Sequence, residues 1–388
     1  MSERLVYLDH AATTPMRAEA VAAMSPYFAE VYSNPSGSHR FARRARQAID
    51  EARDVVAGVI GCDAGEVVFT GGGTEGDNMA IRGVIERRRG SAVCSAAEHH
   101  AVLHSVEHVG GRVVGVDSHG SIDLPALAGT LGDATSVSVM AVNNETGTRT
   151  DLAEVRALLR RQGSKAVLHT DAVQAACWLD LREIWKHVDT MALSAHKFGG
   201  PKGVGVLVIR RGVDVAPLVL GGGQERDRRS GTHNVSGIIG LASALQATDR
   251  ERPNDGMRTI DLREHLIDGI SRIGGVHRTV PGDRAVPGIA HVCIEGVESE
   301  ALLFLLDEGG VCASAASACA SGAMEPSHVL AAMGVPRALA AGSLRLSLGH
   351  TTTADDIGRA VEVVSAAIVR VREATKRLGA RSASGKPS

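Results

Sequence analysis

The sequence contains no long apolar segment. None of its 388 residues belongs to a stretch that approaches the roughly 20 apolar residues needed to span a membrane, and residues 1–15 lack the apolar core of a signal peptide. These absences argue against a membrane protein and against a secreted one. We therefore expect a cytoplasmic protein that does not associate with membranes.

Cysteines are few and far apart. The six cysteines form no C-x-x-C pair, which argues against both a disulfide framework and a zinc site, so no metal is expected. A chain of this length buries roughly three quarters of the surface that its unfolded form exposes, so it needs no such crosslink for stability. The cysteines are Cys62, Cys94, Cys177, Cys293, Cys312 and Cys319.

An excess of charge of either sign is also missing. The formal net charge is −2, and the arginine runs, such as those at residues 43–44 and 87–89, are short. A protein that binds nucleic acid needs a basic face to neutralise phosphates. We expect no direct nucleic-acid binding and interpret the arginine runs as solvated helix faces.

Short apolar or β-branched runs alternate with helical segments through the first two thirds of the chain. This pattern predicts an α/β fold with a largely parallel seven-stranded sheet, covered by helices on both faces. The expected strands are residues 67–70, 92–95, 112–116, 137–141, 166–170, 190–194 and 204–209.

A polar, proline-containing break at residues 250–255 predicts a domain boundary. We expect a large domain at residues 15–253, and a smaller α+β domain formed by residues 1–14 and 254–380. Residues 381–388 have low complexity and are expected to be disordered.

Polar and glycine-rich residues follow several of the expected strands. In open α/β sheets, ligands bind at the carboxyl ends of the strands, so these residues are expected to meet at one edge. They are Gly71-Gly72-Gly73-Thr74, Glu98-His99-His100, Asn143-Asn144-Glu145, Asp171 and His196-Lys197.

The glycine turn at residues 71–74 lies between a strand and a helix. Backbone N–H groups at such a helix start can hold an anion such as phosphate, and Thr74 can add a hydroxyl. No lysine follows the glycines and the G-x-G-x-x-G spacing is missing, so neither a P-loop nor a dinucleotide site is indicated. A purely structural turn stays an equally good interpretation.

Lys197 and Asp171 are the strongest candidates for chemistry. A partly desolvated Lys197 would have a lowered pKa and could attack a carbonyl, although a surface lysine would look the same in sequence. Asp171 ends a buried strand, where its carboxylate needs a positive partner such as a pyridinium nitrogen. Its alternative role is to cap the helix that follows.

Histidines and a small-residue segment complete the candidates. The ring of His99 could stack on a cofactor, whereas the spacing of His100, His104 and His108 would suit either a metal or an exposed helix face, which we favour. Residues 310–322 are rich in Ala, Ser and Gly and predict a mobile loop that carries Cys319, with Cys312 packed at its root.

Taken together, these segments resemble the class V aminotransferase-like cysteine desulfurases that serve iron–sulfur cluster assembly and tRNA thiolation. The resemblance covers nearly the whole chain, in the family's order and spacing. It is carried by residues 7–15, 72–78, 98–102, 143–147, 171–174, 194–203, 221–226, 229–232, 317–322 and 344–349.

The resemblance implies a transferase of fold type I that depends on pyridoxal 5′-phosphate (PLP). Lys197 would form the Schiff base, Asp171 would pair with the pyridine nitrogen, Gln174 would bond the phenolic oxygen, and His99 would stack on the ring and take part in catalysis. The implied phosphate cup consists of Gly73, Thr74, Ser194 and His196, completed across a homodimer by Thr232 of the partner subunit. Asn144, which also lies at the cofactor, Arg345 and Asn34 would face the substrate.

The implied reaction converts L-cysteine to L-alanine and leaves the sulfur as a persulfide on Cys319, from which an acceptor protein takes it. Alternatives are a selenocysteine lyase, an aminotransferase or another class V PLP enzyme, or a non-catalytic scaffold that binds metal through its histidines. The chain departs from the family at Ala316 and Gly76, where glycine and serine or alanine are usual, and in its short C-terminal end.

Overall fold

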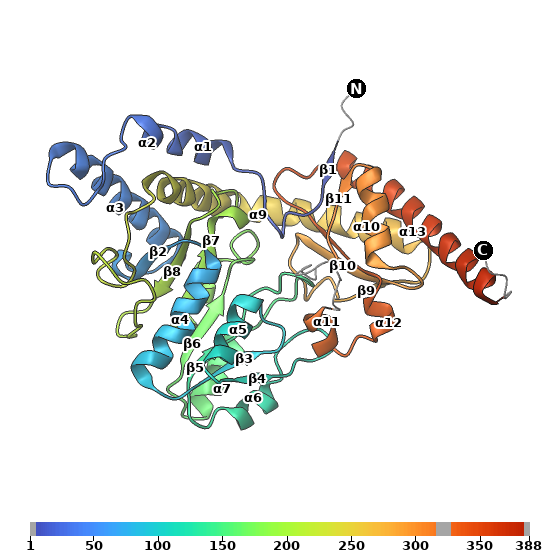
Figure 1. Cartoon of the computed structure of the whole chain (residues 1–388), viewed down its shortest axis with the longest axis horizontal. Coiled ribbons are helices and arrows are strands. Elements are labelled where there is room, and N and C mark those ends of the chain that lie inside the picture. The colour runs from blue at the N-terminus through green and yellow to red at the C-terminus, as the bar shows by residue number, and fades with distance from the viewer. Residues whose placement is uncertain (1–4, 316–326, 384–388) are drawn as a thin grey trace.

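The computed structural model describes residues 5–315 and 327–383 (Figure 1). Cys319, Ala316 and the tail beyond residue 383 lie outside the described residues, as does most of the loop expected at residues 310–322. Within the described ranges, no helix is long and apolar enough to cross a membrane.

The larger part of the molecule contains a seven-stranded sheet in the order β2-β8-β7-β6-β5-β3-β4, which confirms the predicted fold class. Strand β8 is antiparallel to both neighbours, and the other pairings are parallel. The strands are β2 (Val67–Thr70), β3 (Ser91–Ser95), β4 (Arg112–Val114), β5 (Ala134–Ser138), β6 (Val167–Asp171), β7 (Thr190–Ser194) and β8 (Gly205–Ile209). Strand β5 begins and ends three residues before the expected 137–141.

Helices cover both faces of this sheet because its central strands are apolar on both sides. One face packs against α3 (Arg40–Ile60), α7 (Leu152–Arg161) and α8 (Leu181–Trp185), and the other against α4 (Gly73–Arg88) and α5 (His100–His108). Helices α1 (Ala18–Met24), α2 (Pro26–Ala29) and α6 (Leu124–Thr130) and the 3₁₀ turns η1 (Ala64–Glu66) and η2 (Ala195–Lys197) complete this part.

The smaller part has its own apolar core around an antiparallel sheet in the order β12-β10-β9. A parallel pair, β1 with β11, joins the N-terminal segment to this part. Its elements are β1 (Val6–Tyr7), β9 (Val276–Arg278), β10 (Ile289–Ile294), α10 (Ser299–Glu308), β11 (Val311–Cys312), α11 (His328–Ala332), α12 (Arg337–Ala340), β12 (Ser343–Ser347) and α13 (Ala354–Ala383).

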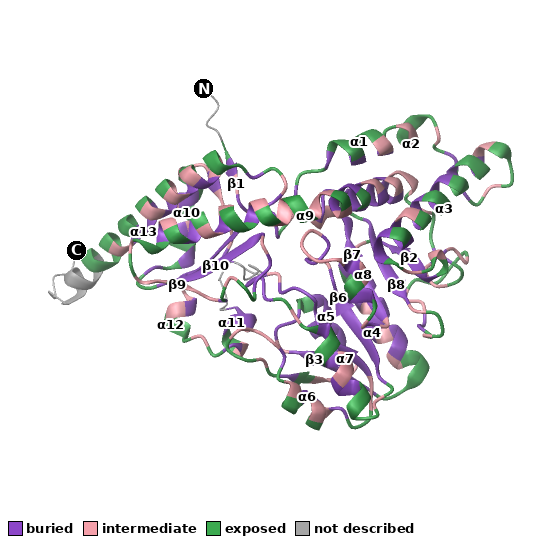
Figure 2. Cartoon of the chain, turned by 180° about the vertical axis from the view of Figure 1, so that it is seen from behind, coloured by how far each residue is buried: buried purple, intermediate pink, exposed green. Residues whose placement is uncertain are grey.

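Helix α9 (Val235–Ser271) runs from one part of the molecule into the other. The break expected at residues 250–255 is therefore wrong, because these residues are helical. Leu241 and Leu245 lie in the core of the large sheet, whereas Leu266 and Ile270 lie in the core of the small one. The polar stretch with Pro253 crosses between the two cores, where its side chains are more exposed (Figure 2). Packing at both ends keeps the helix continuous, because tertiary contacts supply most helical stability in proteins. The expected domain limits stay a prediction.

Candidate active site

Lys197 lies in η2, directly after β7, at the edge where the parallel strands end. Its ε-amino group donates hydrogen bonds to the carbonyl oxygens of Ala11 (2.6 Å) and Ala12 (2.9 Å). Burial, and then the positive charge of Arg345, lower the pKa of Lys197 to about 8. A substantial fraction of the amine is therefore neutral near neutral pH, as a nucleophile requires.

Asp171 ends β6 and is almost completely buried. Burial, and then the nearby Asp77, raise the pKa of its carboxyl to about 7. The next helix is capped by Asp180, so the alternative role of Asp171 as a helix cap is wrong; it accepts a hydrogen bond from the N–H of Val173 instead (2.8 Å). A buried carboxyl whose ionisation is disfavoured in this way fits a cationic ring nitrogen, which would stabilise its charge.

Behind Asp171 lies a second buried pair that the sequence analysis missed. The Nε2 atom of His169 lies 3.2 Å from Oδ1 of Asp77, and His169 Nδ1 lies 2.9 Å from the hydroxyl of Thr190. Burial lowers the pKa of His169 to about 4 and raises that of Asp77 to about 8. Both side chains are therefore mostly neutral near pH 7. Of the three buried groups His169, Asp77 and Asp171, we expect a positively charged ring to ionise Asp171.

The glycine turn, the start of α4 and the end of β7 line one open hollow of about 920 Å³. It brings together the phosphate-cup residues expected from the sequence: Gly73, Thr74, Ser194 and His196. A Cβ atom on Gly73 would lie 2.6 Å from Cγ2 of Val173, so a larger residue cannot take its place without movement. The N-terminus of the 16-residue α4 faces an anion favourably, and this supports a phosphate here over a purely structural turn.

His99 precedes α5 and its side chain is exposed. Its Nδ1 atom accepts a hydrogen bond from the N–H of Ala101 (3.1 Å), which fixes the ring at the helix start. Although the ring remains accessible, the groups packed around it partly desolvate it and lower its pKa, so the ring is neutral near pH 7. A neutral, oriented and accessible ring is suited to stacking on a flat cofactor.

Arg345 reaches the site from β12 of the small sheet and is almost fully buried. It donates to the backbone oxygen of Asn144 and to Oδ1 of Asp9, both at 2.8 Å. Its Nε atom is buried and has no hydrogen-bond partner among the described residues. This guanidinium can bind a further carboxylate. The sequence did not single out Asp9, because its charged partner Arg345 lies 336 residues away along the chain.

The other expected site residues differ in placement. Gln174 lies beside Lys197, where its side chain donates to the carbonyl oxygen of Ala11 (2.7 Å). Asn34 is exposed and accepts a hydrogen bond from the N–H of Ser36, two residues away (2.9 Å). Thr232 is exposed, and within the described residues no hydrogen bond joins it to the phosphate cup. The roles expected for Asn34 and Thr232 stay predictions.

The two ends of the segment that carries Cys319 are fixed at this site, although Cys319 itself lies outside the described residues. On one side, the backbone of Ser314 pairs with that of Arg345. On the other, the hydroxyl of Ser327 donates to the carboxylate of Glu145, and the ring of His328 lies 2.9 Å from the carbonyl oxygen of Glu98. The segment therefore leaves and re-enters the described structure beside Arg345 and His99.

The histidines of α5 do not form a ligand set. The rings of His100 and His104 lie 5.1 Å apart, and the ring of His328 lies 4.5 Å from that of His100. Throughout residues 5–315 and 327–383, no group of three or more His, Cys, Asp and Glu side chains could hold a metal ion. Nothing in this part of the chain favours the metal-binding alternative.

Comparison with known proteins gives one consistent result. The family model described as Aminotransferase class-V matches residues 6–359. The chain is 42% identical to the IscS-like cysteine desulfurase of Mycobacterium tuberculosis, over 95% of this chain and 98% of that protein. It is 39% identical to the cysteine desulfurase IscS of Methanosarcina thermophila, over 95% of this chain and 93% of that protein.

Solved structures agree with the sequence relatives. A NifS-like protein superposes with a TM-score of 0.88 at 33% identity, over 94% of this chain and all (100%) of the other. A structure described as SspA in complex with cysteine gives a TM-score of 0.77 at 30% identity, over 88% of this chain and 98% of the other.

Proposed function

This chain belongs to the class V aminotransferase family and is a PLP-dependent cysteine desulfurase, and we propose that it transfers the sulfur of L-cysteine to Cys319 and releases L-alanine. The observation that carries the proposal is the meeting of Lys197, Asp171 and Arg345 at one site. They provide, in turn, an amine with a lowered pKa, a buried carboxyl suited to a cation, and a guanidinium suited to a carboxylate. A selenocysteine lyase or an aminotransferase is not favoured by these relatives.

When bound, PLP supplies an aldehyde that links covalently to an amine and a protonated ring that withdraws electrons from the substrate Cα. The residues that fit it are Lys197 for the covalent link, Asp171 for the ring nitrogen, Gln174 for the phenolic oxygen and His99 for the ring face. Gly73, Thr74, Ser194 and His196 would hold the phosphate, with Asn144 close by.

The protein's own residues bind the substrate and move its protons. Arg345 binds the carboxylate of cysteine through paired N–H groups, which orients the Cα–H bond towards Lys197. Lys197 is suited to act as the base, because its pKa of about 8 favours proton removal near neutral pH. It takes the Cα proton and later returns a proton to the carbon chain of the product.

Cys319 receives the sulfur. Its thiolate attacks the sulfur of the bound cysteine, so that a new S–S bond forms as the C–S bond breaks, and the bonding pair of the C–S bond stays with the carbon that becomes the methyl group of alanine. The fixed ends of its segment, at Ser314 and Ser327, support a place for Cys319 next to the substrate.

The proposal also covers the partner subunit, the role of Asn34 and the sulfur acceptor. The enzyme is a homodimer in which Thr232 of the partner subunit completes the phosphate cup, since Thr232 is exposed and is not among the residues that line the cup of its own chain. Asn34 assists at the substrate. A cytoplasmic acceptor protein removes the persulfide sulfur, for iron–sulfur clusters or for thiolation of a cofactor or nucleic acid.

The test is the release of alanine and sulfide from L-cysteine in the presence of a thiol reductant. We expect both from the intact enzyme and a loss of about 10⁴-fold or more in Cys319→Ser, because a serine hydroxyl is essentially never ionised at neutral pH. Cys312→Ser is the control, since burial raises the pKa of the Cys312 thiol and disfavours its thiolate. Persulfide on Cys312 and none on Cys319 would overturn the assignment.

A further inference from the structure

The turn that carries Lys197 is bracketed by a segment from the N-terminal part of the chain. The N–H of Thr14 donates to the carbonyl oxygen of His196 (3.1 Å), and the N–H of Arg17 donates to that of Gly199 (2.9 Å). Gly199 has a φ of +85°, and a Cβ atom there would lie 2.6 Å from Cγ of Arg17. The Arg17 side chain therefore packs directly on the turn that carries Lys197.

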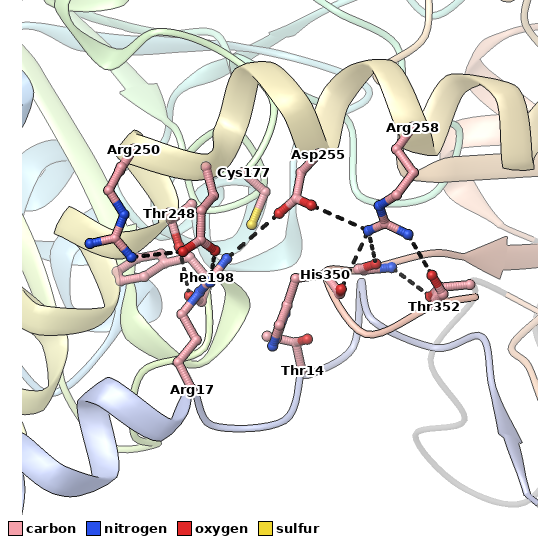
Figure 3. A network of polar contacts seen from close by, with 12 residues as sticks. Thr14, Arg17, Cys177, Phe198, Thr248, Arg250, Asp255, Arg258, His350 and Thr352 are labelled. Atoms are coloured by element: carbon pink, nitrogen blue, oxygen red, sulfur yellow. Dashed lines mark hydrogen bonds and ion pairs between the residues drawn. The ribbon is translucent and has the colours of Figure 1, made fainter.

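The guanidinium of Arg17 connects this turn to α9 (Figure 3). It forms ion pairs with Glu251 and, at 3.9 Å, with Asp255, and only 6% of its side chain is exposed. The hydroxyl of Thr248, also on α9, donates to the carbonyl oxygen of Phe198 (3.0 Å). The stretch of α9 between the two cores is thus attached to the residues that follow Lys197, directly at Phe198 and through Arg17 at Gly199.

Asp255 continues the connection into the small sheet. It accepts a hydrogen bond from Arg258, one turn further along α9 (3.3 Å). The guanidinium of Arg258 also donates to three carbonyl oxygens that follow β12, namely those of Gly349 (3.4 Å), His350 (3.3 Å) and Thr352 (2.5 Å). Arg345 lies on strand β12, four residues before Gly349.

The two ends of this chain of contacts therefore lie beside the two groups that must face one substrate. Arg17 is in contact with the turn of Lys197, whose amine acts at Cα, and Arg258 is in contact with the turn behind Arg345, whose guanidinium binds the carboxylate. A cavity of about 30 Å³ has Arg17, Asp255, His350 and Lys197 among its lining residues, so this part of the connection and the lysine face the same small space.

We propose that Arg17 is a positioning residue: together with Asp255 and Arg258, it sets the distance between Lys197 and Arg345. The inference rests on the proposed function, because that function assigns the two ends their roles. Arg17 itself touches neither substrate nor cofactor. A displacement of about 1 Å between reacting groups can cost on the order of 100-fold in rate, so an indirect contact of this kind has measurable consequences.

Arg250 is a matched control. It lies on the same helix and forms an ion pair with the same Glu251 as Arg17 does, but 64% of its side chain is exposed and it contacts no part of the Lys197 turn. Arg250→Gln therefore removes a charge at the same carboxylate without breaking the connection between the two sheets.

The first measurement uses the chain without added cofactor and needs no activity. Hydrogen exchange is followed in peptides that cover residues 195–200 and residues 349–353. We expect Arg17→Gln and Asp255→Asn to speed exchange in both peptides by at least several-fold, because opening at one end releases the other. Arg250→Gln should change neither peptide. Faster exchange at residues 195–200 alone would overturn the coupling.

The second measurement is steady-state alanine release by the loaded enzyme. In Arg17→Gln we expect the KM for cysteine to rise and kcat/KM to fall by about tenfold to 100-fold, with partial recovery in Arg17→Lys. A merely structural role would reduce the amount of active enzyme and lower the apparent kcat with KM unchanged. Asp255→Asn is close in size to the native side chain and decides the question if Arg17→Gln does not fold.

The outcomes separate the two proposals. An intact enzyme that releases no alanine from cysteine contradicts the proposed function, whereas the exchange experiment still tests the coupling. An active enzyme whose Arg17→Gln and Asp255→Asn variants keep the native KM contradicts only the role given to Arg17.

Discussion

The ε-amino nitrogen of Lys197 lies 2.6 Å from the carbonyl oxygen of Ala11. Ala11 follows β1, which pairs with β11 of the small part, so the reactive amine of the large sheet is held by a segment anchored elsewhere. The same oxygen accepts a hydrogen bond from Gln174 (2.7 Å). The N-terminal segment therefore orients two of the residues assigned to the cofactor.

Lys197→Ala should lose both covalent cofactor attachment and turnover. Among the described lysines, Lys197 has a pKa lowered to about 8 by burial, which makes it the amine best suited to react with an aldehyde at neutral pH. Borohydride reduction followed by peptide mapping should label Lys197 alone. Lys186→Ala, at an exposed side chain paired with Glu183, is the control and should retain label and activity. Label on any other lysine contradicts the assignment.

Arg345→Lys should raise the KM for cysteine by about tenfold or more. Lysine keeps the positive charge but cannot offer two parallel N–H donors to a carboxylate, and it loses the contacts with Asn144 and Asp9. Attachment of the cofactor to Lys197 should be unchanged, as borohydride labelling would report. An unchanged KM would show that the substrate carboxylate binds elsewhere.

Asp171→Asn should stabilise the chain without cofactor at pH 8 and yet inactivate the loaded enzyme. The pKa of Asp171 is raised from 3.8 to about 7, so the folded state holds its proton more tightly than the unfolded state does. Stability is therefore lost as pH rises from about 4 to 7, and the full penalty is present at pH 8. Asparagine removes that penalty, of roughly 4 kcal/mol, but cannot keep a ring nitrogen protonated.

Thermal unfolding of the two chains at pH 4 and pH 8, with and without PLP, measures this effect. Without PLP, the variant should have a higher Tm than the native chain at pH 8, and the difference in Tm should be smaller at pH 4. PLP should raise the Tm of the variant less than it raises that of the native chain. A variant that gains as much from PLP as the native chain does would contradict the pairing of Asp171 with the ring.

Glu225 should make the fold sensitive to acid. Burial alone would raise the pKa of its carboxyl, but hydrogen bonds from Arg53, at 2.7 Å to each oxygen, and from His233 lower it to about 2. The pair therefore contributes its full stability above about pH 4.5 and loses it as pH falls towards 2, on the order of 2–3 kcal/mol in all.

Urea unfolding at several pH values compares the native chain with Glu225→Gln. The variant should be less stable at pH 7 and should show a flatter dependence on pH below 4.5. Asp63→Asn, at a carboxylate that is 61% exposed in its pair with Arg211, should leave the pH dependence unchanged. Parallel pH curves for Glu225→Gln and the native chain would contradict the assignment.

Much of the site could be predicted because its signals are local. Lys197, Asp171 and the glycine turn each follow a strand directly, and the edge at which parallel strands end is a consequence of the fold class. Short apolar runs interleaved with helical segments likewise indicated the sheet. The main error was the helix break predicted at residues 250–255. In the sequence, Pro253 and its polar neighbours are typical of a break, whereas in the structure packing at both ends of α9 keeps these residues helical.

By itself, then, the sequence determined which residues are the candidates for the chemistry and that Lys197, Asp171 and the glycine turn gather at one sheet edge, since strand periodicity and turn chemistry act over a few residues. Only the tertiary structure decided the pairings between distant segments. Arg345 donates to a backbone oxygen 201 residues earlier, at Asn144, and Arg17 reaches Glu251 across 234 residues. No local pattern specifies such contacts, because they follow from how the two cores pack on α9. That packing sets where Arg345 lies relative to Lys197.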